Sequence, residues 1–521
     1  MVVGERARLG RGLALVALTT ASALLRLGGR SFSLWVDEGM SVGIASHPLV
    51  EIPGVLARDG SPPLYYLLLH GWMALAGSSP GAVRALSLVF ALAAVPVAFW
   101  AGHRLVSERA GWLAAVLAAT VPYLSVQSRE ARMYSLLVLV GLVAVTTFVG
   151  AFALGRRRWL AGFVLSLTAV LYTHHWGLFL ALALAAGAGW CVAGADAGAS
   201  RRRITLDAVA AFGAVAALYA PWVPTLLAQM AETGAPWSRT PGPGDVLYAF
   251  GWVLGGWGVV LTLAVVVVIL VRARRRGGEA AGSGDERITG LLVAILTTAV
   301  AASWIASQLT PAWSARYFGT YLPVLILLAA TALARAGRAG VVGLGVVVVL
   351  WTVPLPFVAE GRTPGAAVAK SNVATLAGSL DGLVGAGDVV VSTQMEQVPL
   401  LAYYLGAQPR YADPDGVVDD PRVADWRHVL DRMRTADPVA VLDPLVAGLE
   451  AGGHILLVCP RLFTDGDDLL WYRLMDRHCA SATRALERDP RVVRVWGPVP
   501  GPEVDQVGAS VAMTVYERTG R

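Results

Sequence analysis

The chain has 521 residues, of which 56% are hydrophobic and only 15% are charged. Soluble globular proteins carry about a quarter charged residues, so this composition excludes an ordinary soluble enzyme and predicts a multi-pass membrane protein with a soluble appendage. The net charge of +6 does not indicate a nucleic-acid partner, because the arginines cluster between apolar segments, where they report membrane topology.

Apolar segments alternate with polar connectors as far as about residue 360. We predict about eleven membrane-spanning helices, at residues 11–29, 82–103, 109–124, 133–154, 159–173, 176–195, 206–226, 246–271, 288–307, 318–335 and 340–358. The shortest are marginal, because a helix needs about 20 residues to cross the hydrocarbon core. Since many spans follow the basic N-terminus, we interpret the first span as an uncleaved helix rather than a signal peptide.

Every second connector is rich in arginine. These connectors lie at residues 6–11, 104–109, 156–158, 201–203, 272–276 and 335–338. The positive-inside rule then places the N-terminus in the cytoplasm, and an odd number of spans places the C-terminus outside. The opposite connectors carry acids, histidines and aromatic residues, which we expect at the outer face of the plasma membrane.

The long connector at residues 30–80 contains an apolar, aromatic segment at 62–72 that opens with two prolines. Proline is favoured in the first turn of a helix. Counting this helix as a span would invert the arginine pattern of all later connectors. We therefore interpret it as an interfacial helix on the outer leaflet, within a transmembrane domain of residues 1–360.

Residues 361–521 have a different character. Strand-like runs at 388–392, 454–459 and 510–515 alternate with helical patterns at 425–435 and 469–486, which predicts an extracytoplasmic α/β domain. Cys459 and Cys479 both lie in this region. A disulfide between them and a pair of free buried thiols remain equally open.

Two adjacent acids, Asp37 and Glu38, follow the first span. A carboxylate where lipid meets water can take a proton from a hydroxyl while a lipid-borne substrate stays in the bilayer. The competing interpretation is that the pair caps an interfacial helix that begins near Gly39. We predict that Asp37 and Glu38 are catalytic.

Cations and aromatic residues occupy the other outer connectors. Arg129 and Arg132 flank Glu130, and Arg316 with Tyr317 opens the tenth span. Arginines bind phosphate through charge-assisted hydrogen bonds, so we predict that these arginines and Tyr317 bind a donor phosphate. The competing interpretations are interfacial snorkelling of the arginines and an aromatic-belt anchor.

A substrate pocket is predicted from further residues of the outer connectors, namely Glu130, Tyr65, His174, His175 and Trp237. The two histidines have no acidic partner at ligand spacing, so a metal site is weakly supported, and a divalent cofactor, Mg or Mn, is left open. The chain lacks a Walker A motif, which argues against an ATP-driven pump. Few ionisable residues interrupt the spans, which argues against an ion-coupled transporter.

Taken together, four motifs resemble the GT-C glycosyltransferases. They are the Asp-Glu pair after the first span, Pro-Pro-Leu-Tyr-Tyr at 62–66, Glu-Ala-Arg-Met-Tyr at 130–134, and Arg-Tyr with a later Leu-Pro at 316–323. The nearest branch resembles the protein-mannosyltransferase and aminoarabinose-transferase-like (family 39-like) enzymes, over roughly residues 10–360. The resemblance implies a polyprenyl-phosphate sugar donor and transfer outside the cytoplasm.

The resemblance also implies roles for single residues. Asp37 matches the catalytic acid of the first outer loop, with Glu38 as its fallback, and Arg316 and Tyr317 match the late phosphate-binding region. Ser61 stands where relatives often carry Lys or His, so Arg129 or Arg132 would bind the phosphate instead. Many relatives have a second aspartate before the fourth span, where this chain offers only Glu130.

The sequence thus predicts an inverting transferase that moves mannose, or a similar hexose or pentose, to a glycan, lipid or protein acceptor of the cell wall. Asp37 would be the base. The alternatives are a lipid-linked glycan flippase or transporter and a non-catalytic glycan-binding membrane protein. In all cases we expect Asp37, Arg129, Arg132 and Arg316 to gather around one pocket at the outer face.

Overall fold

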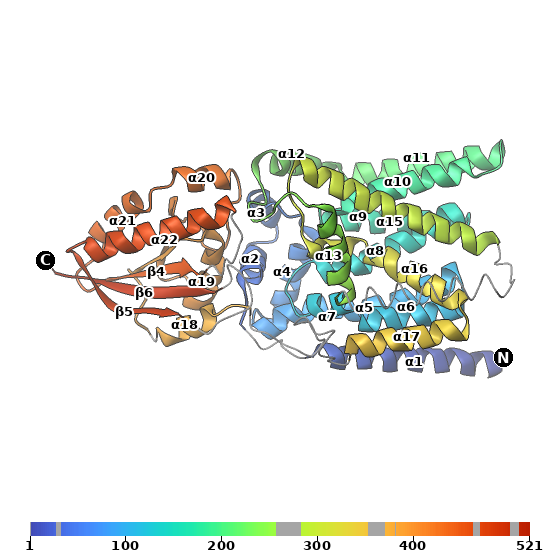
Figure 1. Ribbon diagram of the computed structural model, residues 1–521, viewed down its shortest axis with the longest axis horizontal. Coiled ribbons are helices and arrows are strands. Elements are labelled where there is room, and N and C mark those ends of the chain that lie inside the picture. The colour runs from blue at the N-terminus through green and yellow to red at the C-terminus, as the bar shows by residue number, and fades with distance from the viewer. Residues whose placement is uncertain are drawn as a thin grey trace. The chain divides into compact units, whose positions relative to one another are not determined.

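The computed structural model describes residues 2–27, 33–256, 283–352, 370–380, 382–461, 469–500 and 510–520 (Figure 1). The chain divides into two compact units that are interleaved along the sequence. The helical unit contains Met1–Gly28, Arg84–Val223 and Thr240–Ala366, and the mixed unit contains Gly29–Val83, Pro224–Arg239 and Ala367–Arg521. The predicted fold class, a multi-pass helical membrane protein with a C-terminal α/β domain, is confirmed. The boundary at residue 360 stays a prediction.

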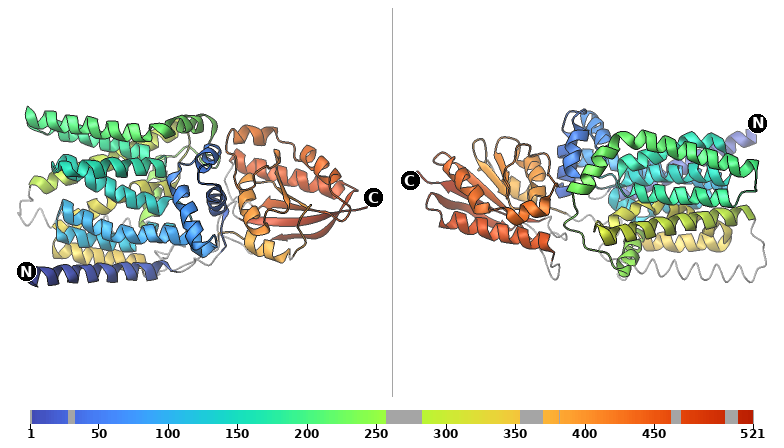
Figure 2. Two further views of the ribbon diagram at one scale, coloured as in Figure 1. Left: turned by 180° about the vertical axis from the view of Figure 1, so that it is seen from behind. Right: turned by 90° about the horizontal axis from the view of Figure 1, so that it is seen from above.

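The helical unit is a bundle whose helices run side by side (Figure 2). Its described α-helices are α1 (Val2–Arg26), α5 (Pro80–Leu105), α6 (Glu108–Thr120), α7 (Pro122–Gln127), α8 (Tyr134–Phe148), α9 (Leu160–Thr173), α10 (Gly177–Ala193), α11 (Ala199–Tyr219), α13 (Pro243–Leu254), α15 (Ser283–Leu309), α16 (Leu322–Arg335) and α17 (Arg338–Thr352). A π-helical turn, η1 (Val149–Ala153), extends α8, and the 3-10 helices η2 (Arg157–Trp159), η3 (Ala220–Trp222) and η4 (Ala315–Thr320) lie between α-helices.

The composition of these helices suits a bilayer. Among the described residues, five helices are long and apolar enough to cross one, at Arg8–Arg26, Pro80–Leu105, Tyr134–Ala153, Ala199–Glu232 and Glu286–Leu309. Large apolar side chains such as Val16, Leu165 and Val209 are more than 60% exposed, which costs little only where lipid replaces water. The predicted spans at 246–271 and 340–358 run partly outside the described residues, and the count of eleven stays a prediction.

The mixed unit is built on a six-stranded sheet with the order β3-β2-β1-β4-β6-β5. The strands are β1 (Val389–Ser392), β2 (Arg410–Asp413), β3 (Gly416–Val417), β4 (His454–Pro460), β5 (Val492–Pro500) and β6 (Val511–Arg518). β1 is parallel to β2 and β4, while β6 runs antiparallel to β4 and β5. All four residues of β1 are buried, as expected of a central strand covered on both faces.

Helices cover this sheet: α18 (Val373–Ser379), α19 (Val398–Leu405), α20 (Val429–Thr435), α21 (Pro438–Ala447) and α22 (Leu470–Arg488), with the 3-10 turn η5 (Met395–Gln397) between β1 and α19. Alternate sheet residues, among them Val391 and Leu457, pack with Leu445 and Leu486 of α21 and α22 in one apolar core. Cys459 of β4 and Cys479 of α22 form a disulfide, so the first of the two alternatives for these cysteines is correct.

The long connector after the first span folds with this α/β domain. It forms α2 (Val36–Ala45), α3 (Ile52–Asp59) and α4 (Leu64–Ala76), and α12 (Val223–Glu232) joins the same unit. α4 is the helix predicted at 62–72, and its position on the outer leaflet stays a prediction. The side-chain amide of Gln229 on α12 donates to the carbonyl of Leu56 at 2.9 Å, which ties α12 to α3.

α2 is held at both ends by the α/β domain. Before its first turn, the backbone N–H of Leu34 donates to Tyr404 Oη at 2.7 Å. After its last turn, His47 Nε2 lies 2.6 Å from Asp420 Oδ2. Two glycines on α2 allow the middle of the helix to lie directly against the domain, because a Cβ at Gly39 would be 2.8 Å from Leu400 Cα and a Cβ at Gly43 would overlap the Arg422 carbonyl.

Gly43→Ala should therefore lower the stability of the mixed unit by about 1–3 kcal/mol, because the new methyl group meets backbone that cannot rotate away. Gly71→Ala on α4 is the matched control: no atom lies within 4 Å of the added Cβ, and alanine is the better helix former. Thermal unfolding of the purified variants in detergent measures both. An unchanged melting temperature for Gly43→Ala would show that α2 is not packed this closely.

Candidate active site

The predicted catalytic acids lie in the first turn of α2. The helix begins at Val36, three residues before the start expected from sequence, and both Asp37 (8% exposed) and Glu38 (0% exposed) are buried. Glu38 Oε2 accepts the backbone N–H of Trp35 at 3.4 Å, so this carboxylate caps the helix N-terminus. The capping interpretation thus holds for Glu38, which leaves Asp37 as the stronger candidate for chemistry.

A third carboxyl group, which sequence reasoning missed, belongs to the same unit. Glu396 in η5 is only 7% exposed. The pKa of Glu396 is raised to about 7, chiefly by burial and to a smaller extent by the negative charge of Asp37, while hydrogen bonds from Gln394 and Trp471 act to lower it. The signal in the sequence was faint, because Glu396 is one acid in a loop of the C-terminal domain, more than 350 residues from Asp37.

The predicted cations of the helical unit lie close to the ends of four helices. Arg132 precedes α8, His174 and His175 join α9 to α10, and Arg316 lies in η4 before α16. His174 is buried. Burial lowers the pKa of this connector histidine well below its ordinary value, and the charges of His175, Arg132 and Arg316 lower it further. We call Arg132, His174, His175 and Arg316 the cationic cluster.

Aromatic rings wall this cluster. The ring of Tyr317 lies 4.8 Å from that of His174, 5.2 Å from that of Trp176 and 6.4 Å from that of Tyr134, measured between centroids. The guanidinium carbon of Arg316 lies 5.9 Å from the centre of the Tyr317 ring. Because the N–H of Trp176 donates to His174 Nδ1 at 3.1 Å, the neutral imidazole carries its proton on Nε2.

The backbone at Arg316 is also fixed. Tyr123 of α7 donates its hydroxyl to the Arg316 carbonyl at 2.6 Å. A Cβ at Gly319 would overlap the Tyr123 ring, so glycine is required for η4 to lie this close to α7. The guanidinium group of Arg316 is therefore carried on a well-anchored turn, which is what a binding site for a charged ligand needs.

Arg129 contacts the end of α1. Its Nη2 donates to the carbonyl of Leu25 at 3.1 Å, at the C-terminal end of α1, where a cation also complements the helix dipole. Next to it lies Arg26, a fully buried arginine that sequence reasoning missed. Arg26 donates to Ser22 Oγ and to the Ala118 carbonyl, so it joins α1 to α6. An arginine inside an apolar span was the available signal.

The remaining predicted pocket residues are divided between the units. Glu130 is buried in the helical unit, and Tyr65 is fully buried on α4 of the mixed unit. Trp237 packs edge-on against Trp426 at 4.8 Å between ring centroids, beside an apolar cluster that includes Met40 of α2. The expectation that acids and arginines share one pocket stays a prediction, as does each assigned role.

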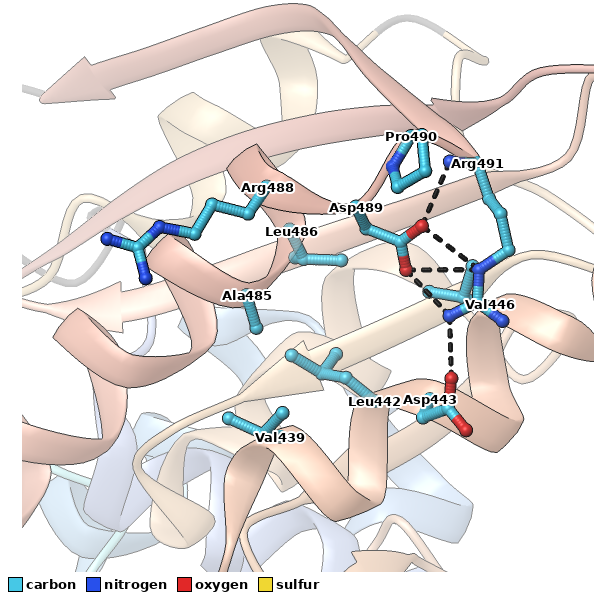
Figure 3. Close-up of a pocket in the computed structure, with 10 residues that line it drawn as sticks. All are labelled: Val439, Leu442, Asp443, Val446, Ala485, Leu486, Arg488, Asp489, Pro490 and Arg491. Atoms are coloured by element: carbon cyan, nitrogen blue, oxygen red, sulfur yellow. Dashed lines mark hydrogen bonds and ion pairs between the residues drawn. The ribbon is translucent and has the colours of Figure 1, made fainter.

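No group of three or more His, Cys, Asp or Glu side chains among the described residues is arranged to hold a metal ion. The surface hollow between α21 and α22 (Figure 3) is a separate feature of the α/β domain, with a volume of about 390 Å³. Arg491 spans it, with Nη2 at 2.7 Å from Asp489 and 2.6 Å from Asp443. None of the predicted site residues lines this hollow.

Solved structures with the same fold identify the architecture. ArnT from Cupriavidus metallidurans in the apo state matches with a TM-score of 0.61 at 15% identity, over 98% of both chains. The structure of the same protein bound to undecaprenyl phosphate gives 0.59 at 14% identity, again over 98% of both chains. The archaeal oligosaccharyltransferase AglB from Archaeoglobus fulgidus, in complex with an inhibitory peptide and a dolichol-phosphate, gives 0.53 at 11% identity, over 85% of this chain and 68% of that one.

These structures define the class of fold: the chain has the GT-C glycosyltransferase architecture. The resemblance drawn from the sequence motifs is thereby confirmed for the superfamily fold. No protein-family model matches the chain, and no curated protein matches its sequence.

Proposed function

We propose that this protein is a membrane glycosyltransferase that moves a sugar from a polyprenyl-phosphate donor to an acceptor hydroxyl outside the cytoplasm. The observation that supports it most directly is the cationic cluster, which gathers two arginines and two histidines against an aromatic wall in a GT-C fold. That undecaprenyl phosphate is bound by ArnT, and a dolichol-phosphate by AglB, supports a donor of the same chemical class.

The cationic cluster suits the leaving group. When the sugar departs, the phosphate oxygen gains the electrons of the broken bond, and the resulting polyprenyl phosphate is a stable anion. It therefore needs positive charge more than it needs a proton. Arg316 and Arg132 provide guanidinium groups, and neutral His174 can donate its Nε2 proton in a hydrogen bond. Tyr317 lines the same cluster.

Asp37 suits the role of base. Its carboxylate takes the proton of the acceptor hydroxyl, the acceptor oxygen forms a bond to the anomeric carbon, and the bond from that carbon to the phosphate oxygen breaks on the opposite face. One displacement of this kind inverts the anomeric configuration.

The particular reaction we propose is transfer of mannose, or a related hexose or pentose, to a cell-wall glycan, lipid or protein at the outer face of the plasma membrane. Purified protein in detergent should consume radiolabelled polyprenyl-phosphate mannose or pentose and yield a glycosylated acceptor of inverted configuration. A flippase or a glycan-binding protein would leave the donor chemically intact. An intact donor with every sugar and acceptor class tried would refute the proposal.

A further inference from the structure

Glu396 is a buried carboxyl group whose hydrogen bonds are incomplete. Its Oε1 accepts the amide N–H of Gln394 at 2.8 Å. Its Oε2 is buried and accepts no hydrogen bond of ordinary geometry, and the Trp471 side chain lies close enough to the carboxyl group to lower its pKa. Leaving an acceptor of this kind unpaired in the interior is costly, and a carboxyl group lowers that cost by keeping its proton. The fold alone gives no reason for an acid here.

Asp37 is the charge that acts on Glu396. The two residues are in one compact unit, and α2 lies directly against η5 and α19. Met40 of α2, Met395 of η5 and Trp471 of α22 belong to one apolar cluster. The close approach at Gly39 and Leu400 keeps α2 in place. Asp37 and Glu396 therefore lie in two elements that pack against each other, and the charge of Asp37 acts on the Glu396 carboxyl group.

Several titratable groups on the helices near η5 bind other partners. On α2, Glu38 caps Trp35. On α19, the hydroxyls of Tyr403 and Tyr404 bind the Ser78 carbonyl and the Leu34 N–H. On α20, Arg432 contacts Met395 Sδ at 3.7 Å, but its Nε binds Asp415 at 2.8 Å.

We propose that Glu396 is a positioning residue for Asp37, which holds a proton beside it and thereby keeps Asp37 as the anion that accepts the proton of the acceptor hydroxyl. The inference rests on the proposed function and deepens it, because it makes the C-terminal α/β domain part of the active site. Two neighbouring carboxyl groups in an apolar setting carry one negative charge more easily than two. The proton taken from the acceptor passes to Asp37 and then to water, while Glu396 keeps its own.

This arrangement has a pH signature. The folded-state pKa of Glu396, about 7, lies above its ordinary value, so ionisation is disfavoured in the folded protein. The stability that the protonated form contributes is complete at acidic pH and is lost as the pH rises through about 7. Above that pH Asp37 is still an anion, but a second anion now repels it. Because this repulsion opposes the position of the Asp37 carboxylate, we expect the transfer rate to fall.

The first test needs no activity. The infrared C=O band of a buried protonated carboxyl group should titrate near pH 7 in the full-length protein and should be absent in Glu396→Gln. Asp37→Asn should move that midpoint to lower pH, because the negative charge that helps to raise the pKa is gone. A midpoint that does not respond to Asp37→Asn overturns the proposal, as does a band that survives in Glu396→Gln.

The second test is the pH profile of transfer. In the wild-type protein the rate should be about tenfold lower at pH 8 than at its plateau, since a group with a pKa of about 7 is then about 90% ionised. Glu396→Gln cannot ionise, so its profile should lack this decline. Asp413→Asn is the matched control: Asp413 is another acid of the same domain whose pKa burial raises, to about 6, yet it should leave the decline in place.

The two tests fail differently. If the infrared titration behaves as expected but no variant consumes the donor, the proposed function is wrong. The inference that Glu396 holds a proton beside Asp37 is then still supported. If transfer occurs and Glu396→Gln, folded by its melting temperature, keeps the wild-type decline above pH 7, the role of Glu396 is wrong and the proposed function stands.

Discussion

Asp37→Asn should lower the rate of sugar transfer by at least about 100-fold, the smallest usual contribution of a general base. Asparagine has the same shape and cannot accept the proton. Asp37 is buried in the first turn of α2, whereas the bond that caps the helix at Trp35 is made by Glu38. The folded state should therefore survive the change. Transfer from radiolabelled polyprenyl-phosphate sugar and the melting temperature measure the two properties separately.

Two companion variants make this result specific to Asp37. Glu51→Gln changes an exposed acid of the same connector, before α3, and should leave the rate unaffected. Glu38→Gln keeps an oxygen that can accept the Trp35 N–H, so capping survives while ionisation is lost. If Glu38 only caps the helix, Glu38→Gln retains transfer. If Glu38 is the base, Glu38→Gln loses transfer while Asp37→Asn retains it, and the assignment of the base is reversed.

Arg316→Met should lower kcat/KM for the lipid-linked donor by about 10- to 100-fold, since a hydrogen bond to a charged group is worth about 1.5–3 kcal/mol. Methionine retains the apolar stem against the Tyr317 ring, and the bond from Tyr123 uses only the backbone carbonyl, so η4 should stay in place. The kcat/KM of Arg316→Lys should lie between those of the wild-type protein and Arg316→Met, because lysine keeps the positive charge but lacks the planar guanidinium group.

The matched control is Arg158→Met, which removes an exposed arginine of the same unit. The measurement is the initial rate of transfer at several donor concentrations, with the acceptor saturating. A loss that is confined to kcat/KM for the donor is what we expect if Arg316 binds the donor phosphate. If Arg316→Met binds and uses the donor like the wild-type protein, the cationic cluster is an interfacial anchor and not a phosphate site.

The sequence alone determined the architecture in outline. Apolar segments such as 134–153 and 286–309 indicate membrane spans, because polar segments are not stable in the hydrocarbon core of a bilayer. The alternation of strands and helices after residue 380 predicted the α/β domain. β1 and β4 lie within one residue of the runs expected, and β6 begins within one residue and continues three residues further. The residues of a helix or strand were therefore enough to predict that element wherever they also determine how it is buried.

Tertiary structure decided which distant residues meet. Sequence placed Asp37 with the transmembrane part, but the first outer connector packs into one unit with the C-terminal domain, because the surface of α2 at Gly39 and Gly43 fits backbone some 360 residues away. Glu396, in a loop, had no local pattern to mark it, and the only signal for Arg26 was its place inside a predicted span. The burial of Arg26 and Glu396 arises only when the chain folds. The same holds for the effect of Asp37 on Glu396, since charges interact through space and not along the sequence.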